Sequence, residues 1–168
     1  MLHIKTVKGR GYEWACEDPT AFHSPKPFKV EGCRVTIQKG SGKSWTSAFA
    51  DAMVAQAKKN EKVVGITVAM ADGTGMIKLK SACPDRYFDT GICESHATAM
   101  AAGMAKGGLR PVIAVYSTFL QRAFDQVFQE VCLQGLPVTF CVDRAGLVGD
   151  DGAVHHGFCD LANLQETP

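Results

Sequence analysis

The sequence predicts an α/β fold, in which a parallel sheet is flanked by helices and preceded by an extended N-terminal connector. Two observations support this prediction. Short apolar runs rich in β-branched residues recur along the chain, as is typical of strands that are buried on both faces. Segments with helical spacing of apolar residues separate these runs. Strands that alternate with helices indicate βα units and therefore a parallel sheet.

Hydrophobic periodicity places the individual elements. Strands are expected over residues 62–69, 86–89, 111–116 and 137–142, and the first and the last two of these read as fully buried. Helices are expected over residues 45–59, 94–106 and 118–134, with a weakly helical segment between the turn at 72–75 and residue 82. Gly107 and Gly135 follow the two later helices, where glycine commonly ends a helix.

The first 43 residues differ from the remainder of the chain. Glycine and proline interrupt any long periodicity there, so this stretch is interpreted as a strand end followed by an extended connector. From residue 44 to residue 168 the pattern is that of one domain. A length of 168 residues fits one domain with such an extension.

Composition argues against several classes of function. The 18 basic and 17 acidic residues leave a formal charge of +1, which provides no electrostatic reason to bind nucleic acid or an anionic membrane. No apolar run approaches membrane-spanning length, and the charged residues near Met1 do not resemble a signal peptide. The 7 cysteines form no CxxC pair. We expect them to be buried free thiols in the cytoplasm, without a zinc site.

Polar residues follow the predicted strands at the edge of the sheet where α/β proteins bind ligands. Glu94 begins the helix at 94–106, where the backbone dipole favours a carboxylate. This position fits a functional carboxylate, and it also fits ordinary helix-start electrostatics. Tyr116 ends the next strand, Thr118 and Arg122 follow it, and the three could surround an anion. They fit equally well a capped helix start with Phe119 packed in the core.

The third polar segment is the glycine-rich loop that follows residue 142. It contains Arg144, Asp151, His155 and His156, and loops with several ionisable side chains are often functional. Histidine suits proton transfer near neutral pH. Adjacent histidines do not easily bind one ion together, so we predict no metal site here.

Several motifs resemble those of the 1-deoxy-D-xylulose-5-phosphate synthase family, thiamin diphosphate enzymes related to transketolase. The resemblance spans nearly the whole chain, and the motifs keep the order and the approximate spacing that they have in the family. The motifs are Lys8-Gly-Arg-Gly-Tyr12, Asp18-Pro-Thr-Ala-Phe-His23, Pro84-Asp-Arg-Tyr-Phe-Asp89, Gly91-Ile-x-Glu94-x-His96, Tyr116-Ser-Thr-Phe-Leu-Gln-Arg-Ala123, Asp143-Arg-Ala-Gly146 and Asp151-Gly-x-x-His155.

The resemblance implies an activity, a cofactor and substrates. Members of the family condense pyruvate with D-glyceraldehyde 3-phosphate, release carbon dioxide and make 1-deoxy-D-xylulose 5-phosphate for isoprenoid, thiamin and pyridoxal synthesis. In such enzymes thiamin diphosphate carries the chemistry, and the protein supplies orientation and electrostatics. A homodimer is also implied, with residues 94–106 at its interface.

The resemblance also implies roles for particular residues. Glu94 is expected to hydrogen-bond the pyrimidine ring of the cofactor, Phe119 to stack on that ring and Tyr12 to contact the cofactor. His155 and His23 are expected to transfer protons, whereas His156 matches no such position and His96 is expected to help position the helix. The acceptor-substrate pocket is expected to be lined by Tyr116, Arg122, Arg144 and Asp151, whose arginines suit a phosphate group. Cys93 and Ser95 depart from the family pattern.

The resemblance divides the chain into two parts. Residues 1–43 would be the end of a preceding diphosphate-binding domain and its linker, and residues 44–168 a pyrimidine-binding domain truncated at its C-terminus. Gly149-Asp-Asp-Gly152 is not the Gly-Asp-Gly motif that binds Mg²⁺ and diphosphate in this family. The magnesium ligands are therefore expected outside the chain, which should be inactive alone. Two alternatives stay open: a subunit of a split transketolase, and a non-catalytic remnant that dimerises.

Overall fold

The computed structural model describes residues 1–38, 42–149 and 152–165. The chain forms two compact units, Met1–Gly42 and Lys43–Pro168, which are described separately.

The larger unit contains a four-stranded parallel sheet with the strand order β4-β3-β5-β6. The strands are β3 (Val63–Thr67), β4 (Tyr87–Asp89), β5 (Arg110–Tyr116) and β6 (Thr139–Asp143). All five residues of β3 are buried, as a strand covered on both faces requires. The predicted α/β fold with a parallel sheet is confirmed.

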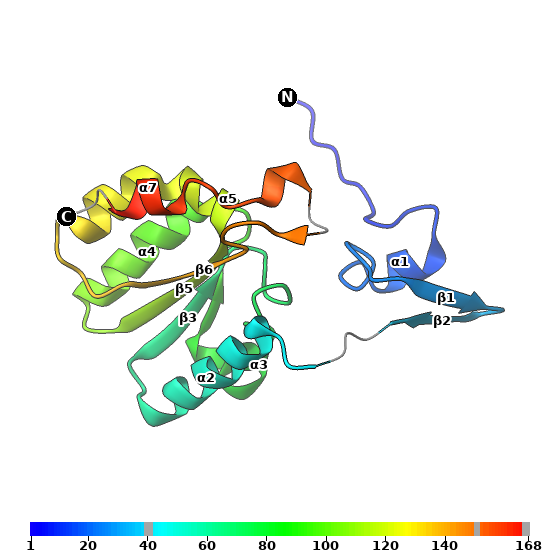
Figure 1. The fold of residues 1–168 in the computed structure, drawn as a ribbon, viewed down its shortest axis with the longest axis horizontal. Coiled ribbons are helices and arrows are strands. Elements are labelled where there is room, and N and C mark those ends of the chain that lie inside the picture. Colours follow the sequence, from blue (N-terminus) through cyan, green and yellow to red (C-terminus); the bar gives the residue numbers. More distant parts are fainter. Residues whose placement is uncertain (39–41, 150–151, 166–168) are drawn as a thin grey trace. The chain divides into compact units, whose positions relative to one another are not determined.

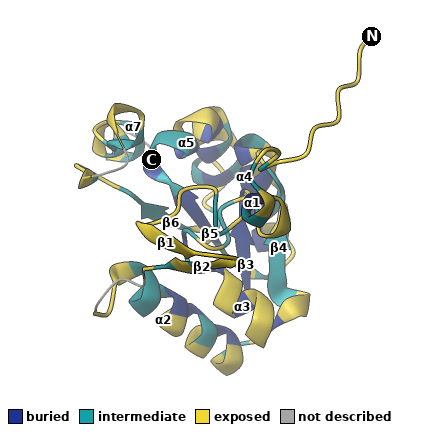
Figure 2. Cartoon of the chain, turned by 90° about the vertical axis from the view of Figure 1, so that its right-hand side faces the viewer, coloured by how far each residue is buried: buried dark blue, intermediate teal, exposed yellow. Residues whose placement is uncertain are grey.

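Helices cover both faces of this sheet (Figure 1). On one face lie α2 (Trp45–Lys59) and α3 (Ile77–Ala82), and on the other lies α4 (Glu94–Lys106) with the helical segments after β5. Because side chains alternate along a strand, Ile113 and Val115 of β5 pack with the α4 layer, whereas Ala114 packs with the α2 layer. In Figure 2 the central strands are coloured as buried, and the outer sides of the helices as exposed.

The prediction of one continuous helix over residues 118–134 is wrong. The chain instead forms α5 (Ser117–Leu120), a 3₁₀ turn (Gln121–Ala123), α6 (Phe124–Gln126) and a π-helical stretch (Val127–Cys132). One contribution to the break comes from α4, where Ser95 Oγ donates a hydrogen bond of 2.8 Å to the carbonyl oxygen of Arg122. A side chain inserted into the backbone ladder is a recognised cause of such irregularity.

Two expectations about burial are wrong. Strand β6 is only partly buried, because β5 is its one partner within the described sheet. The cysteines are free, as expected, but Cys83 alone is fully buried. Two are half-buried, Cys132 and Cys141, and four are exposed in turns, loops or helix ends, namely Cys16, Cys33, Cys93 and Cys159.

The smaller unit has more structure than the extended connector that was expected. It contains a short helix, α1 (Glu13–Glu17), and an antiparallel hairpin of β1 (Phe28–Glu31) and β2 (Arg34–Ile37). Gly32 and Cys33 form the two-residue loop, and Gly32 has a φ of 59°. The sequence carried this signal, because a glycine-containing pair between two alternating runs is typical of a hairpin.

The end of β4 organises two neighbouring loops. Asp89 Oδ1 accepts hydrogen bonds from the backbone N–H groups of Ala69 (2.8 Å) and Gly91 (3.0 Å). Ala69 has a φ of 60°, which is uncommon for a residue with a side chain, and its hydrogen bond to Asp89 supports that conformation. The hydroxyl of Tyr87 donates to Asp89 Oδ2 over 3.3 Å. Burial, followed by the charge of Asp89, raises the pKa of Tyr87 to about 12.

After β6 come a Gly-rich loop with a 3₁₀ turn (Ala153–His155) and then α7 (Asp160–Gln165). Among the described residues, no helix has both the length and the apolar character needed to cross a bilayer.

We predict that Gly65→Ala destabilises the larger unit by about 1–3 kcal/mol, because the added methyl group would overpack a filled core. A Cβ atom at Gly65 would meet the side chains of Leu79, Met76 and Met53. Gly103→Ala on α4 is the matched control, since a Cβ there meets nothing within 4 Å. It should raise stability by about 0.5–1 kcal/mol. Urea unfolding measures both, and equal stability of the two variants would contradict this account of the core.

We predict that Tyr87 ionises near pH 12. The folded-state pKa is raised above the unfolded value, so the stabilisation from this group is complete below about pH 10 and is lost as the pH rises through 12. Absorbance titration of tyrosinate in the wild type and in Tyr87→Phe identifies the group. Asp89→Asn should lower the pKa of Tyr87, and an unchanged pKa in that variant would refute the contribution of Asp89.

Candidate functional site

The site is built around Glu94, the first residue of α4. Its side chain is 4% exposed, although it is ionisable. The carboxylate oxygen Oε1 accepts a hydrogen bond of 2.7 Å from the guanidinium of Arg122, and the two groups form an ion pair. A buried carboxylate requires such compensation, since its desolvation is costly.

Arg122 links Glu94 to an aromatic ring. Its guanidinium lies over the ring of Phe119, with its central carbon 5.0 Å from the ring centroid. Its backbone carbonyl accepts the hydrogen bond from Ser95, the residue after Glu94. The segment after β5 is therefore attached to the start of α4 by both the backbone and the side chain of Arg122. The role of Ser95 was not foreseen from the sequence.

Phe119 belongs to a wall of stacked rings. The rings of Tyr116 and Phe119 are stacked, with centroids 5.8 Å apart and an angle of 21° between their planes. The ring of His155 meets the ring of Phe119 edge-on, with centroids 5.6 Å apart, although the two residues lie far apart in the sequence. On Tyr116, the guanidinium of Arg144 lies 4.0 Å from the ring centroid. Stacking of this kind positions rings and cations relative to one another.

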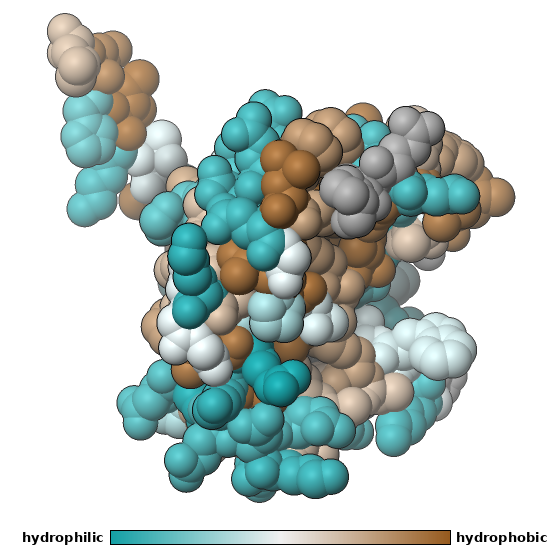
Figure 3. Space-filling view, turned by 90° about the vertical axis from the view of Figure 1, so that its left-hand side faces the viewer, coloured by the Kyte–Doolittle hydropathy of each residue, from teal (hydrophilic) through white to brown (hydrophobic). Residues whose placement is uncertain are grey.

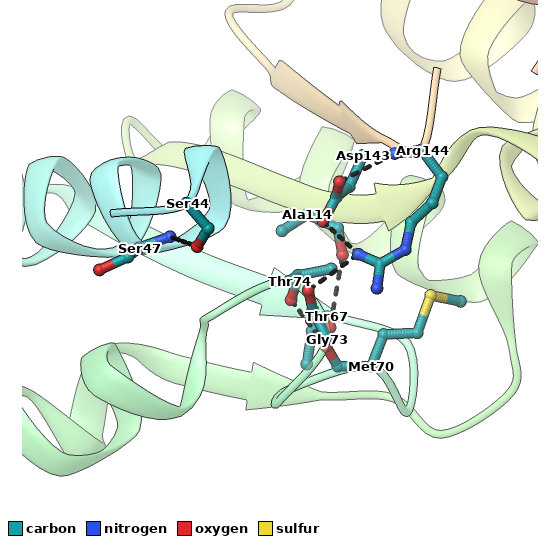
Figure 4. A network of polar contacts seen from close by, with 9 residues as sticks. All are labelled: Ser44, Ser47, Thr67, Met70, Gly73, Thr74, Ala114, Asp143 and Arg144. Carbon is teal, nitrogen blue, oxygen red and sulfur yellow. Dashed lines mark hydrogen bonds and ion pairs between the residues drawn. The ribbon is translucent and has the colours of Figure 1, made fainter. Parts of the chain in front are cut away.

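Arg144 is held at the end of β6 in a left-handed backbone conformation, with a φ of 57°. Its backbone N–H donates to Asp143 Oδ1 (2.8 Å), and its guanidinium donates to Asp143 Oδ2 (2.7 Å) and to the carbonyl of Gly73 (3.0 Å). Figure 4 shows the side chain pointing from the end of β6 toward the loop that carries Gly73. The hydroxyl of Tyr116 packs against Gly73 so closely that a Cβ atom would collide with it. The loop after β3 therefore positions both Tyr116 and Arg144.

The Gly-rich loop is closed at its base. Gly146 and Gly157 exchange two backbone hydrogen bonds of 2.9 Å, and the backbone N–H of Val148 donates to His156 Nδ1 over 3.0 Å. His156 therefore fastens the loop that presents His155, a role that the sequence did not indicate. Ser117 Oγ donates to the carboxylate of Asp160 at 2.6 and 2.7 Å, which anchors the segment that follows the loop.

A hollow of about 220 Å³ lies on the α2 side of the sheet, opposite to the α4 side that carries Glu94. Burial raises the pKa of the Cys141 thiol in its wall. Of the residues that line the hollow, Asp143 also belongs to the site, because it pairs with Arg144. Its lining residues are Trp45, Thr46, Phe49, Thr74, Ala114, Cys141, Val142 and Asp143.

Most of the residues predicted from the sequence lie in one continuous series of contacts. That series consists of Glu94, Arg122, Phe119, Tyr116, Arg144 and His155. Arg122, which was predicted to line a substrate pocket, contacts Glu94. His96 is exposed on α4. Asp151 lies outside the described residues. Tyr12 and His23 belong to the smaller unit, so their predicted roles stay predictions.

The arrangement fits a flat, nitrogen-rich heterocycle. A buried carboxylate can accept a hydrogen bond from a ring N–H or an exocyclic amine, and a neighbouring aromatic face can stack on the ring. The planar guanidinium of Arg122 already makes both kinds of contact, with Glu94 and with Phe119. An aminopyrimidine could make the same pair of contacts. Within residues 1–38, 42–149 and 152–165 there is no cluster of three His, Cys, Asp or Glu side chains able to hold a metal ion.

Comparison with curated proteins shows close relatives along the whole chain. It is 54% identical over 168 residues to "1-deoxy-D-xylulose-5-phosphate synthase" of Aquifex aeolicus, covering 100% of this chain and 27% of that protein. It is 51% identical over 168 residues to "1-deoxy-D-xylulose-5-phosphate synthase 1" of Geobacter sulfurreducens, covering 100% and 26%. The chain therefore spans about a quarter of the length of these relatives.

Solved structures share the fold. A "Split gene transketolase, inactive beta4 tetramer" is 29% identical with a TM-score of 0.62, covering 72% of this chain and 39% of that one. A transketolase of Pichia stipitis matches with a TM-score of 0.66 at 16% identity, covering 86% of this chain and 22% of that one. At that identity the likeness shows the fold alone.

Residues 41–168 match the family described as "Transketolase, pyrimidine binding domain". The four-stranded parallel sheet and the motif resemblance agree with this match. The chain belongs to the transketolase pyrimidine-binding domain family and is homologous to 1-deoxy-D-xylulose-5-phosphate synthases.

Proposed function

We propose that this chain is the pyrimidine-binding part of a 1-deoxy-D-xylulose-5-phosphate synthase. Such an enzyme would condense pyruvate with D-glyceraldehyde 3-phosphate and release carbon dioxide. The observation that carries the proposal is the buried carboxylate of Glu94, which lies at the carboxyl end of the sheet and is joined through Arg122 to the ring of Phe119. The similarity to synthases over the whole chain supports it.

In this proposal Glu94 and Phe119 hold the aminopyrimidine of thiamin diphosphate. Bound thiamin diphosphate would supply stabilisation of the negative charge left when carbon dioxide departs from pyruvate. Glu94 would hydrogen-bond the ring nitrogen N1′ and share a proton with it. Its burial supports this role, because a hydrogen bond in a water-poor site keeps its geometry and strength. Phe119 would supply a stacking face.

Tyr116, Arg144 and His155 are proposed to bind the acceptor aldehyde. A guanidinium suits the phosphate of D-glyceraldehyde 3-phosphate, because it can donate two parallel hydrogen bonds. His155 would exchange a proton with the carbonyl and hydroxyl oxygens. Asp151 and Arg122 are proposed for the same pocket, and for Arg122 this requires its guanidinium to leave Glu94.

The proposal assigns the remaining parts of the reaction to the rest of a longer enzyme. Residues 1–43 would be the end of a diphosphate-binding domain with its linker, and residues 44–168 the pyrimidine-binding domain. Tyr12 would contact the cofactor and His23 would act in proton transfer. The ligands of Mg²⁺ would lie outside this chain. A cytoplasmic location belongs to the same proposal.

We also propose that the chain forms a homodimer through residues 94–106. In Figure 3 hydrophilic side chains cover most of the lower part of one face, at the level of α2, whereas apolar side chains stand among hydrophilic ones over the upper part, at the level of α4 and α7. The large exposed apolar side chains of this layer lie beside α4, on the segment after β5 and on α7, and include Phe124, Phe128, Leu133 and Leu161. Exposed apolar side chains on neighbouring helical segments support a protein interface in this layer.

A subunit of a split transketolase is the second candidate. The likeness to a split-gene transketolase at 29% identity favours it, whereas 54% identity to a synthase favours the first proposal. The donor substrate distinguishes the two: a synthase uses pyruvate, and a transketolase uses a ketose phosphate. If the chain is instead a non-catalytic remnant that dimerises, neither donor should be turned over.

We predict that Glu94→Gln lowers synthase turnover by about 10²–10⁴-fold, because the amide cannot share a proton with the cofactor ring. The variant is made in a protein that carries this segment together with the remaining length of its relatives. Turnover with pyruvate and D-glyceraldehyde 3-phosphate is the measurement. Glu130→Gln, on the helical segment after β5, is the matched control and should keep wild-type turnover. Full turnover in Glu94→Gln would refute the proposed role of Glu94 in binding the cofactor.

We predict that the 168-residue chain alone does not catalyse the condensation, since the proposal places the magnesium and diphosphate ligands elsewhere. Detection of 1-deoxy-D-xylulose 5-phosphate after incubation with both substrates, thiamin diphosphate and Mg²⁺ is the test. Sustained product formation by the purified chain would refute this division of the site.

A further inference from the structure

We propose that Arg122 is an internal placeholder for the aminopyrimidine. In the ligand-free chain its guanidinium fills the space between the Glu94 carboxylate and the Phe119 ring, and the cofactor has to displace it in order to bind. Arg122 is then a positioning residue that sets the affinity for the cofactor. This inference rests on the proposed function and deepens it.

The geometry supplies the first argument. The guanidinium nitrogen Nη1 of Arg122 lies 2.7 Å from Glu94 Oε1, and the guanidinium carbon lies 5.0 Å from the centroid of the Phe119 ring. One planar group therefore touches both residues that are proposed to hold the cofactor ring. An incoming ring cannot use the same carboxylate oxygen and the same aromatic face while the guanidinium remains.

The chemistry supplies the second argument. With its ring nitrogen N1′ protonated, a 4-aminopyrimidine is, like a guanidinium, a planar cation whose N–H donates to a carboxylate and whose face stacks on an aromatic ring. The same pair of residues can therefore recognise either group. A lysine ammonium would not reproduce the match, because it is a compact charge without a stacking face.

Burial explains why a placeholder is needed. Glu94 is 4% exposed, and a carboxylate buried to this extent without a cation would destabilise the ligand-free fold. Arg122 compensates that charge until a ligand does so.

Exposure explains how the placeholder can leave. The side chain of Arg122 is 55% exposed, so its guanidinium can move into water without crossing the core. The backbone of Arg122 remains attached to α4 through the hydrogen bond from Ser95 Oγ to its carbonyl. The side chain can therefore exchange partners while the segment after β5 keeps its place. The acceptor-pocket role proposed for Arg122 would then be possible only in the cofactor-bound state.

The test compares Arg122→Gln and Arg122→Lys with the wild type in the full-length context of the relatives. Lys59→Gln is the matched control, because it removes an exposed positive charge from the last turn of α2, on the opposite face of the sheet. Two quantities are measured: the dissociation constant of thiamin diphosphate at saturating Mg²⁺, by calorimetry, and the melting temperature with and without the cofactor.

We expect Arg122→Gln to melt at a lower temperature without the cofactor and to bind the cofactor about fivefold more tightly, a change typical of coupling between two competing interactions. The rise in melting temperature on binding should therefore be larger than in the wild type. Arg122→Lys should fold and shift both quantities in the same direction by less. Lys59→Gln should match the wild type.

Equal or weaker cofactor binding by both Arg122 variants would overturn the inference, provided that the wild type binds. A purely structural role would lower both melting temperatures equally and leave the dissociation constant unchanged. A role confined to the acceptor pocket would raise the KM for D-glyceraldehyde 3-phosphate while leaving cofactor affinity unchanged, and this too would overturn it. Failure of the wild type itself to bind thiamin diphosphate would instead refute the proposed function.

Discussion

The ion pair between Glu94 and Arg122 is the interaction on which the rest of the site depends. It compensates a carboxylate that is almost fully buried, and desolvation of an unpaired carboxylate would oppose folding at this point. It also joins the start of α4 to the segment after β5, where the guanidinium of Arg122 lies over the ring of Phe119 and Phe119 stacks on Tyr116. One contact therefore serves both the stability of the α4 layer and the arrangement of the groups proposed to bind ligands.

The second constraint is the convergence of loops at the carboxyl end of a parallel sheet. Every strand of such a sheet points the same way, so the loops after β3, β5 and β6 meet at one edge. The carbonyl of Gly73, the ring of Tyr116 and the guanidinium of Arg144 contact one another there. These groups come from three separate stretches of sequence. Ligand selectivity at this edge can therefore change through the loops while the sheet stays intact.

Backbone conformation contributes to this convergence at two positions where the chain has no glycine. Ala69 and Arg144 both adopt a left-handed conformation, and in both cases an aspartate accepts a hydrogen bond from the backbone N–H of that residue. Asp89 and Asp143 therefore support turns that would otherwise be unfavourable. Both turns aim their loops toward the site, so these aspartates belong to its architecture although neither was singled out as a ligand-binding residue.

The sequence by itself determined the parallel α/β fold, the bounds of α2 and α4, and the position of Glu94 at a helix start. These features depend on local periodicity and on residues close together in the chain, which a single sequence reveals. Tertiary structure decided the break after Leu120, the partial exposure of β6, the contact of His155 with Phe119 and the pairing of Arg122 with Glu94. Each of these depends on groups far apart in sequence, such as Ser95 and Arg122, whose approach is set by packing. Spacing along the chain could indicate that Arg122 binds an anion. Only the folded chain showed that its guanidinium pairs with the carboxylate of Glu94 in the same chain.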